Sequence, residues 1–232
     1  MEVYVGTSGW LYSWNLGKSL KWYVENSGLN AVELNASFYR YPTPRQVAQW
    51  AEVGKALRWA AKVHRSITHF GRLSERAVER LGNFLSLFKP LDPLVDFYLF
   101  QLPPTFQPSG ENMRRVEAVA ALLGRRAAVE FRHPAWFTEA TAKWAERAGF
   151  VAVSVDSPEA SWIVATGGVV YLRMHGRTFW YSHYYDEEEL REVARRVVET
   201  GAGRVYVFFN NDHAMLENAR AMASILRELA KR

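Results

Sequence analysis

The chain of 232 residues contains no cysteine. Disulfide bonds, thiolate nucleophiles and zinc sites built from cysteine are therefore excluded. The first residues, MEVYVGTSGW, lack the basic and apolar stretches of a secretory signal, and no apolar run elsewhere is long enough to predict a membrane span. We therefore expect a cytoplasmic protein with no membrane partner. Nothing in the sequence predicts its oligomeric state.

Long runs of one charge sign are also missing, although the net charge is +5. The arginine pairs at 114–115, 125–126 and 195–196 fall on or beside predicted helices, where a solvated surface explains them. The charge therefore favours anionic partners only mildly. Asparagine and glutamine are sparse, as in many thermophilic proteins, and this suggests a thermophilic source.

A strand-like run followed by a helical pattern repeats along the chain. The strand-like runs lie near 2–7, 31–35, 58–64, 96–101, 126–132, 151–156, 169–175 and 204–210. Helical patterns lie near 16–26, 43–54, 74–88, 111–123, 137–148, 186–200 and 212–230. The stretch 157–168 is too short for a full helix, so we predict an abbreviated sixth connection. No linker divides the chain, and we predict an α/β fold, a single (β/α)8 TIM-barrel domain over residues 1–232.

Most of these runs become polar at their last inward position, which is where active sites gather in parallel α/β proteins. Side chains alternate between the two faces of a strand, so the polar residues are assigned to the barrel interior and their apolar neighbours to the helices. The residues that this alternation assigns to the mouth of the barrel are Glu33, Asn35, Lys62, His64, Glu130, Arg132, Ser154, Asp156, Arg173, His175 and Asn210.

Several long motifs resemble one known family. They are GTSGW at 6–10, VELNASFYRYP at 32–42, KVHRSITH at 62–69, FQLPPTF at 100–106, VEFRHPAWF at 129–137, LRMHG at 172–176 and FFNNDH at 208–213. Together, and in this order, they resemble the YecE-like family, the domain of unknown function numbered 72. The resemblance implies a TIM barrel and no established reaction, so it assigns no catalytic residue. Ala36 departs from the family, which often has threonine or serine there.

The predicted mouth combines carboxylates, imidazoles and permanent cations. Glu33 and Glu130 lead as general acid and base, because unequal cationic neighbours would separate their pKa values. The full set of catalytic candidates is Glu33, Glu130, Asp156, His64 and His175. The cations expected to hold an anionic or polyhydroxy substrate are Lys62, Arg132 and Arg173. The alternative is a structural network in which these charges only neutralise one another.

Aromatic residues follow several of the predicted strands and would surround the mouth, where rings beside cations suit sugars and nucleobases. The aromatic candidates for ligand contact are Trp10, Tyr39, Trp136, Trp180 and Tyr181. The amides of Asn35 and Asn210 are candidates for orienting a substrate by hydrogen bonds. The alternative for the aromatic residues is that they pack helices onto the barrel.

We predict no bound metal and no cofactor, because three cations share the mouth with the candidate ligands. The leading prediction is an enzyme with hydrolase-type acid–base chemistry. Its partner would be an anionic substrate, namely a phosphate-bearing sugar, a nucleotide or a nucleic acid. Two alternatives stay open. One is a carbohydrate-active enzyme or sugar isomerase, and the other is a non-catalytic protein that binds a nucleotide or nucleic acid.

Overall fold

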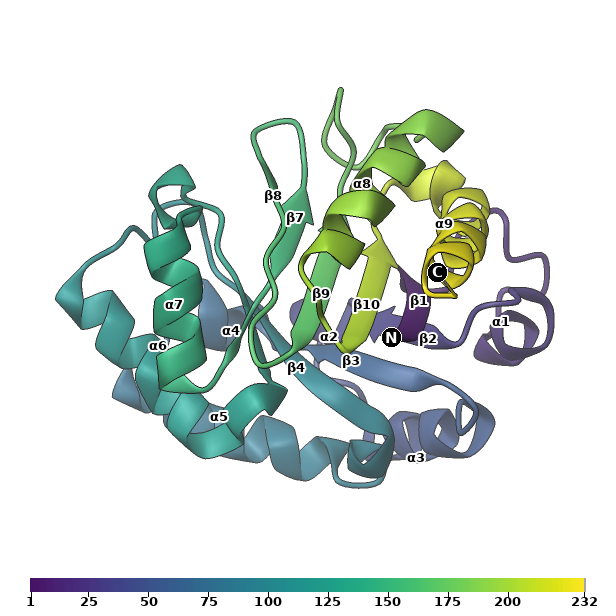
Figure 1. Cartoon of the computed structure of the whole chain (residues 1–232). Coiled ribbons are helices and arrows are strands. Elements are labelled where there is room, and N and C mark those ends of the chain that lie inside the picture. Colours follow the sequence, from purple (N-terminus) through teal and green to yellow (C-terminus); the bar gives the residue numbers. More distant parts are fainter. Residues whose placement is uncertain (232) are drawn as a thin grey trace.

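The computed structural model describes residues 1–231, in which helices cover the outer face of a curled, largely parallel sheet (Figure 1). The strands are β1 (Glu2–Ser8), β2 (Ala31–Leu34), β3 (Arg58–Lys62), β4 (Val95–Gln101), β5 (Ala127–Glu130), β6 (Val151–Ala152), β7 (Ser154–Asp156), β8 (Ser161–Trp162), β9 (Val169–Met174) and β10 (Arg204–Phe209). The α-helices are α1 (Leu20–Asn26), α2 (Ala36–Tyr39), α3 (Pro44–Val53), α4 (Arg65–Thr68), α5 (Glu75–Phe88), α6 (Gly110–Leu123), α7 (Glu139–Ala148), α8 (Glu187–Glu199) and α9 (Met215–Leu229).

The two ends of the sheet meet within residues 151–156. The strand order is β6-β5-β4-β3-β2-β1-β10-β9-β7-β8. Only Val153 separates β6 from β7, and β6 pairs in parallel with β5 whereas β7 pairs in parallel with β9. The parallel strands therefore run around a ring, and the predicted α/β TIM-barrel fold is confirmed.

The sixth connection contains no α-helix. After β7 the chain turns back through β8, which pairs antiparallel with β7, and an isolated bridge joins Thr166 to Val169 before β9 begins. This confirms the predicted abbreviation at 157–168. Helices follow the other strands of the ring, and two of them start at clear sequence signals. Thr43 and Asp186 form capping boxes with Gln46 and Glu189 at the starts of α3 and α8.

Two apolar layers lie on the two faces of the barrel wall. The inner layer includes Ala31, Ala60, Phe97, Leu99, Ala128, Val151, Val153, Tyr171 and Phe208. The outer layer packs the strands against the helices and includes Val32, Ala61, Val129, Leu172 and Val207. Lys62, Glu130 and Arg173 stand two residues beyond inner-layer members of their own strands, so the alternation directs them into the barrel at its carboxyl end.

The sixth strand has the opposite phase to the one predicted. Val151 and Val153 belong to the inner layer, which places Ser154 and Asp156 on the outer face. The Ser154 hydroxyl donates to the carbonyl of Val164, and the Asp156 carboxylate accepts hydrogen bonds from Arg177 and Tyr185. The prediction that Asp156 lies in the mouth is therefore wrong, because its side chain points to the outer face and meets Arg177 and Tyr185 there.

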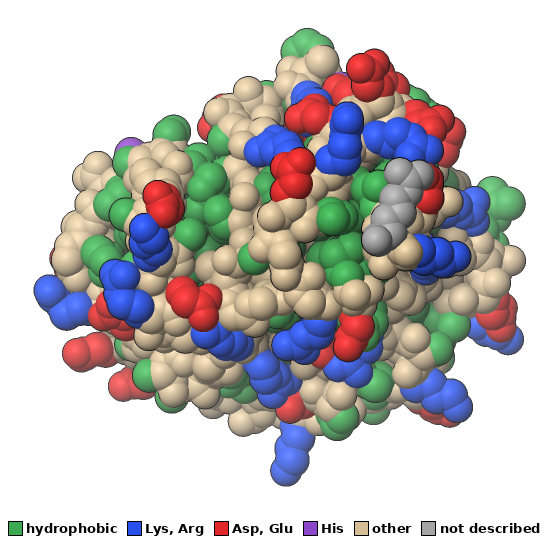
Figure 2. Space-filling view, in the orientation of Figure 1, with side chains coloured by type: hydrophobic (Ala, Val, Ile, Leu, Met, Phe, Trp, Pro, Cys, Tyr) green, Lys and Arg blue, Asp and Glu red, His purple; other side chains and the backbone are tan. Residues whose placement is uncertain are grey.

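Charges of both signs are interspersed on one face of the molecule. On the face shown in Figure 2, Lys and Arg side chains alternate with Asp and Glu side chains around α8 and α9. Within residues 1–231 no helix is both long enough and apolar enough to cross a membrane.

Candidate functional site

A buried arginine joins two of the predicted carboxylates. Arg173, at the end of β9, donates from Nε and Nη2 to Glu33 at 3.0 and 2.6 Å and from Nη1 to Glu130 at 2.5 Å. Glu33 also accepts from the hydroxyls of Ser8, at 2.6 Å, and Tyr171, at 2.7 Å. All three charged side chains are fully buried. Glu33 is therefore held by an ion pair and by hydroxyl donors from two other strands.

Glu130 has two further partners in the same cluster. Arg132 Nε lies 2.6 Å and His175 Nε2 lies 3.0 Å from the same carboxylate oxygen. Burial alone would raise the pKa of Glu130, but Arg132 and Arg173 hold it well below its usual value. Burial, reinforced by Arg132, lowers the pKa of His175 to about 3. His175 is therefore a neutral imidazole beside an ionised carboxylate at neutral pH.

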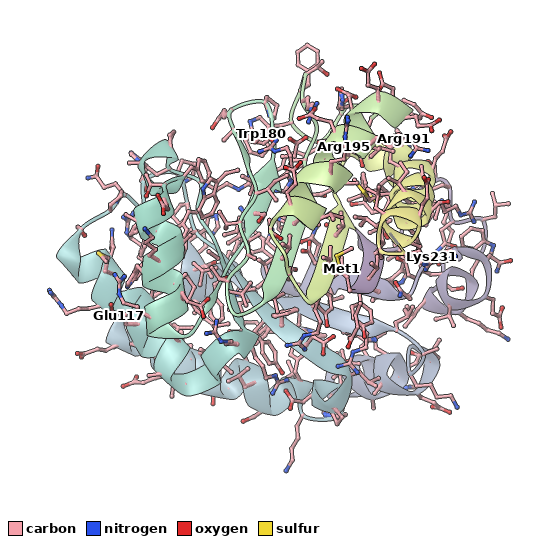
Figure 3. The ribbon with its side chains drawn as sticks, viewed as in Figure 1. Met1, Glu117, Trp180, Arg191, Arg195 and Lys231 are labelled. Carbon is pink, nitrogen blue, oxygen red and sulfur yellow. The ribbon has the colours of Figure 1, made fainter. Side chains whose placement is uncertain are left out.

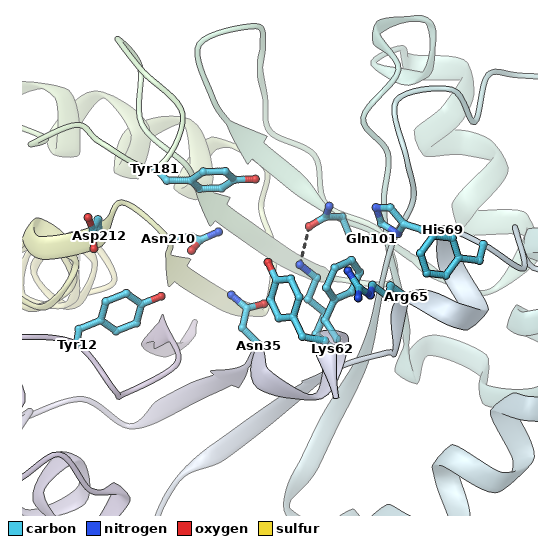
Figure 4. A pocket seen from close by; sticks show the side chains of 12 residues that line it. Tyr12, Asn35, Lys62, Arg65, His69, Gln101, Tyr181, Asn210 and Asp212 are labelled. Carbon is cyan, nitrogen blue, oxygen red and sulfur yellow. Dashed lines mark hydrogen bonds between the residues drawn. The ribbon is translucent and has the colours of Figure 1, made fainter. Parts of the chain in front are cut away.

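A pocket of about 510 Å³ opens above this buried cluster at the carboxyl ends of the strands (Figure 4). Its polar and charged lining consists of Asn35, Lys62, Arg65, His69, Gln101, Asn210 and Asp212. Its aromatic lining consists of Tyr12, Phe38, Tyr39, Phe70 and Tyr181. Neither Glu33 nor Glu130 lines it. The groups that face a ligand in this pocket are therefore different from the two carboxylates predicted to lead the chemistry.

Lys62 is the buried cation of this pocket. Its side chain ends β3, is only 5% exposed, and has its ammonium 4.1 Å from the centre of the Phe38 ring. Nζ donates to Gln101 Oε1 at 2.8 Å (Figure 4), and no carboxylate of the described residues lies within ion-pair distance of it. Burial and the nearby Arg173 charge lower the pKa of Lys62 to about 7. The ammonium and amine forms therefore coexist at neutral pH.

Gln101 Oε1 is approached by three cations. Besides Lys62, Arg173 Nη1 lies 3.3 Å and Arg132 Nη2 lies 3.4 Å from this oxygen. Since Glu33 and Glu130 together balance the two arginines, the Lys62 ammonium is left without a matching negative charge in this cluster. The floor of the pocket is therefore electropositive whenever Lys62 is protonated.

Arg65 and His69, which follow β3 in the sequence, add further polar groups to the pocket. Arg65 is exposed, and its guanidinium lies 6.0 Å from the centre of the Tyr39 ring and 5.6 Å from that of Phe70. Burial and the Lys62 charge lower the pKa of His69 to about 4, so His69 is neutral at physiological pH. The pocket thus combines two cations with a neutral imidazole.

Of the remaining residues predicted to lie in the mouth, four line the pocket and Trp180 does not. Asn35, Tyr39, Tyr181 and Asn210 line the pocket. Trp180 is not in the pocket lining but in the loop between β9 and α8 (Figure 3). Its ring lies 4.5 Å from the Arg132 guanidinium. Trp180 Nε1 also donates to Glu159 in the turn between β7 and β8. This hydrogen bond connects the loop between β9 and α8 to the turn between β7 and β8.

Two predicted positions are wrong in addition to that of Asp156. His64 caps α4 through the backbone N–H of Ser66, and its ring packs on Tyr41 instead of entering the mouth. Trp136 is 2% exposed and stacks between Phe131 and Trp144 under the helices. The Trp136 ring packs helices onto the barrel, which is the alternative that the sequence left open. Trp10 is also buried, edge-on to Trp50 and Trp59, but it lines a smaller pocket beside the mouth, so its contact with a ligand stays a prediction.

Sequence reasoning missed several residues of the site. Gln101 and Ser8 end β4 and β1 at inward positions, so the alternation that found Lys62 would also have found them. Arg65, His69 and Phe70 had no such signal, because they lie in a helical turn and loop whose path depends on packing. Only the fold brings these residues to the pocket.

The donor groups of the site do not assemble a metal centre. Within residues 1–231 no three His, Asp or Glu side chains are placed together to hold a metal ion. Glu130 and His175 are adjacent, but Arg132 and Arg173 occupy the carboxylate oxygens. Metal independence stays a prediction that solution measurements must test.

The sequence and the fold both have relatives. The chain is 32% identical over 142 residues to the UPF0759 protein YecE of Escherichia coli K12, a match covering 59% of this chain and 51% of YecE. The chain thus spans about half the length of this curated relative. A DUF72 family protein of Thermotoga maritima superimposes with a TM-score of 0.79 at 27% identity over 100% of both chains. A D-psicose 3-epimerase solved in the presence of D-fructose shares the fold alone, with a TM-score of 0.57 and 12% identity over 100% of this chain and 97% of the epimerase.

The family profile described as "Protein of unknown function DUF72" matches residues 4–232, nearly the whole chain. The residues it spans include all strands of the ring apart from the first two residues of β1, and every residue that lines the mouth pocket. This chain therefore belongs to the DUF72 family of proteins of unknown function.

Proposed function

We propose that this chain is an enzyme that binds a phosphate-bearing sugar or nucleotide in the mouth pocket and hydrolyses it by acid–base chemistry. The observation that carries the proposal is the buried Lys62 ammonium, which faces the pocket without a carboxylate partner among the described residues. A buried charge without a counter-ion is costly, and an anionic ligand would supply the missing charge.

The distribution of the other charges supports an anion at this position. Glu33 and Glu130 are committed to Arg173 and Arg132, and the remaining lining cation, Arg65, is exposed at the pocket edge. The one carboxylate in the lining, Asp212, lies across the pocket from Lys62 (Figure 4). A phosphate group bound between Lys62 and Arg65 would therefore meet two cations and no adjacent carboxylate.

The titrating groups support acid–base chemistry on such a ligand. The pKa values of Lys62 and His69 are lowered to about 7 and about 4, so the two groups differ in protonation near neutral pH. In this proposal water attacks the phosphorus and gives a proton to neutral His69. The P–O bond to the sugar breaks, and the leaving sugar oxygen takes a proton from solvent. The Lys62 ammonium stabilises charge that develops on the phosphate oxygens. The carboxylates of the buried cluster position Arg173 and Arg132 beneath the ligand.

Calorimetric titration tests the binding step. The ligand panel contains inorganic phosphate, ribose 5-phosphate, nucleoside monophosphates and neutral sugars. We expect phosphate compounds to bind and Lys62→Met to weaken them by about 1.5–3 kcal/mol, the range for hydrogen bonds to charged groups. Lys55→Met is the matched control. Lys55 is exposed and precedes the first residue of β3, far from the pocket end of that strand, and its replacement changes the net charge by the same amount.

Equal affinity of the wild type and Lys62→Met for phosphate compounds would remove the proposed anion site. Tighter binding of neutral sugars than of sugar phosphates would favour the carbohydrate-enzyme alternative. Release of inorganic phosphate from the bound compounds, measured colorimetrically, tests the hydrolytic step. Binding without phosphate release or any other turnover would leave the non-catalytic binding protein as the better description.

A further inference from the structure

A second pocket opens beside the mouth pocket. Its volume is about 340 Å³, and its lining contains no charged side chain. The residues that give it an apolar and aromatic character are Trp10, Leu11, Tyr12, Leu34, Ala36 and Tyr39. This side pocket therefore suits an uncharged group with a flat or apolar surface.

The side pocket adjoins the mouth pocket. Tyr12, Asn35 and Tyr39 line both of them. Figure 4 shows Tyr12 and Asn35 on the side of the mouth pocket that faces away from Arg65 and His69. We infer that one ligand extends from the cations of the mouth pocket into the adjoining uncharged side pocket.

The walls of the side pocket offer aromatic surface to a planar ring. Tyr12 is held by a stacked contact with Trp14, with ring centres 5.7 Å apart and planes within 11°. Tyr39 and Leu11 are 63% and 67% exposed, so a ligand that covers them would remove apolar surface from water. The guanidinium of Arg65 beside Tyr39 adds the cation that commonly accompanies base-stacking rings.

Small residues keep this space open, and a free amide lies at its border. Gly9, at a φ of 99°, and Ala36, exposed at the first position of α2, line the side pocket without filling it. The carboxamide of Asn35 forms no side-chain hydrogen bond with the described residues. A nucleobase has donor and acceptor atoms on its edge that such an amide can recognise. The sugar of a sugar phosphate has no planar ring to fill this space.

We propose that the ligand is a nucleotide, with its phosphate at Lys62 and Arg65 and its base in the side pocket. The phosphate end of this assignment rests on the proposed function. The base end rests on the uncharged side pocket, which is an independent observation. The two parts can therefore fail separately.

The experiment compares nucleoside monophosphates, ribose 5-phosphate and adenosine by calorimetry with the wild type, Ala36→Phe and Ala36→Ser. We expect the wild type to bind at least one monophosphate at least about fivefold more tightly than ribose 5-phosphate, the fold-change for the lower end of base–aromatic stacking. Ala36→Phe should abolish this preference by filling the side pocket. Ala36→Ser, the matched small substitution, should retain it. Ala36 is exposed, so both variants are expected to fold, and their circular dichroism spectra check this.

Equal affinities of the wild type for ribose 5-phosphate and for all monophosphates would overturn the nucleotide assignment and leave the proposed phosphate site intact. A preference that persists in Ala36→Phe would also overturn it. Adenosine binding that Ala36→Phe abolishes and Lys62→Met preserves would support the base pocket even if the phosphate site failed. Absence of binding by every compound would reject both proposals.

Discussion

Replacement of Lys62 by methionine should stabilise the protein at neutral pH. The pKa of Lys62 falls from 10.5 to about 7 on folding, and each pH unit corresponds to 1.36 kcal/mol, so burial of this ammonium costs about 4–5 kcal/mol at pH 7. Lys62→Met removes that cost and keeps a side chain of similar length. It loses one hydrogen bond, to Gln101, worth about 1 kcal/mol. We therefore expect a net gain of about 3 kcal/mol in the free energy of unfolding.

The pH dependence of this gain provides the sharper test. Because the pKa is lower in the folded state, the unfolded chain binds more protons between pH 7 and 10.5, and wild-type stability rises with pH across that window. The advantage of Lys62→Met should therefore shrink by about 1.4 kcal/mol per pH unit between pH 7.5 and 9.5. Urea unfolding, monitored by tryptophan fluorescence at each pH, measures the difference in the free energy of unfolding between Lys62→Met and the wild type. Lys55→Met, which removes an exposed lysine, should show a nearly constant difference from the wild type.

Two results would refute this reasoning. One is a Lys62→Met variant less stable than the wild type at pH 7, which would mean that the ammonium has stabilising partners in the pocket. The other is a stability difference that does not change with pH, which would mean that Lys62 has the same pKa in the folded and unfolded states. If the gain is found, the lysine destabilises the fold, as expected of a group retained for binding or chemistry.

Three further predictions follow from the same cluster. Arg173→Met should destabilise the fold by about 3–5 kcal/mol, because it leaves two buried carboxylates without their shared partner, and urea unfolding at pH 7 measures this; a loss below about 1 kcal/mol would contradict the geometry. Phosphate binding should take up protons and weaken with rising pH above about 7, because the ligand raises the lowered pKa of Lys62; calorimetry in buffers of different ionisation enthalpy measures the uptake, which Lys62→Met should abolish. Removal of divalent metals with a chelator should leave the thermal midpoint unchanged, and about one zinc, manganese or magnesium ion per chain by elemental analysis would contradict this.

Local sequence patterns determined the course of the barrel and part of its site. The alternation of strand-like and helical runs predicts every strand of the ring, because the periods of two and 3.6 residues are properties of the chain itself. The same alternation directs Glu33, Lys62, Glu130 and Arg173 inward. It fails at Asp156, because a strand of two short halves offers two phases and the packing of Val151 and Val153 selects the other one.

Only the tertiary structure decided which of the inward charges remain available to a ligand. Arg173 contacts Glu33 and Glu130, which lie on other strands more than forty residues away in the sequence. No local pattern therefore predicts that Arg173 neutralises both carboxylates. Lys62 lies on the same inward face, yet it meets only an amide and a phenylalanine ring. The burial of Trp136 and the exposure of Tyr39 likewise depend on how helices and loops pack. Partners and burial are set by distances between remote segments, and those distances exist only once the barrel has closed.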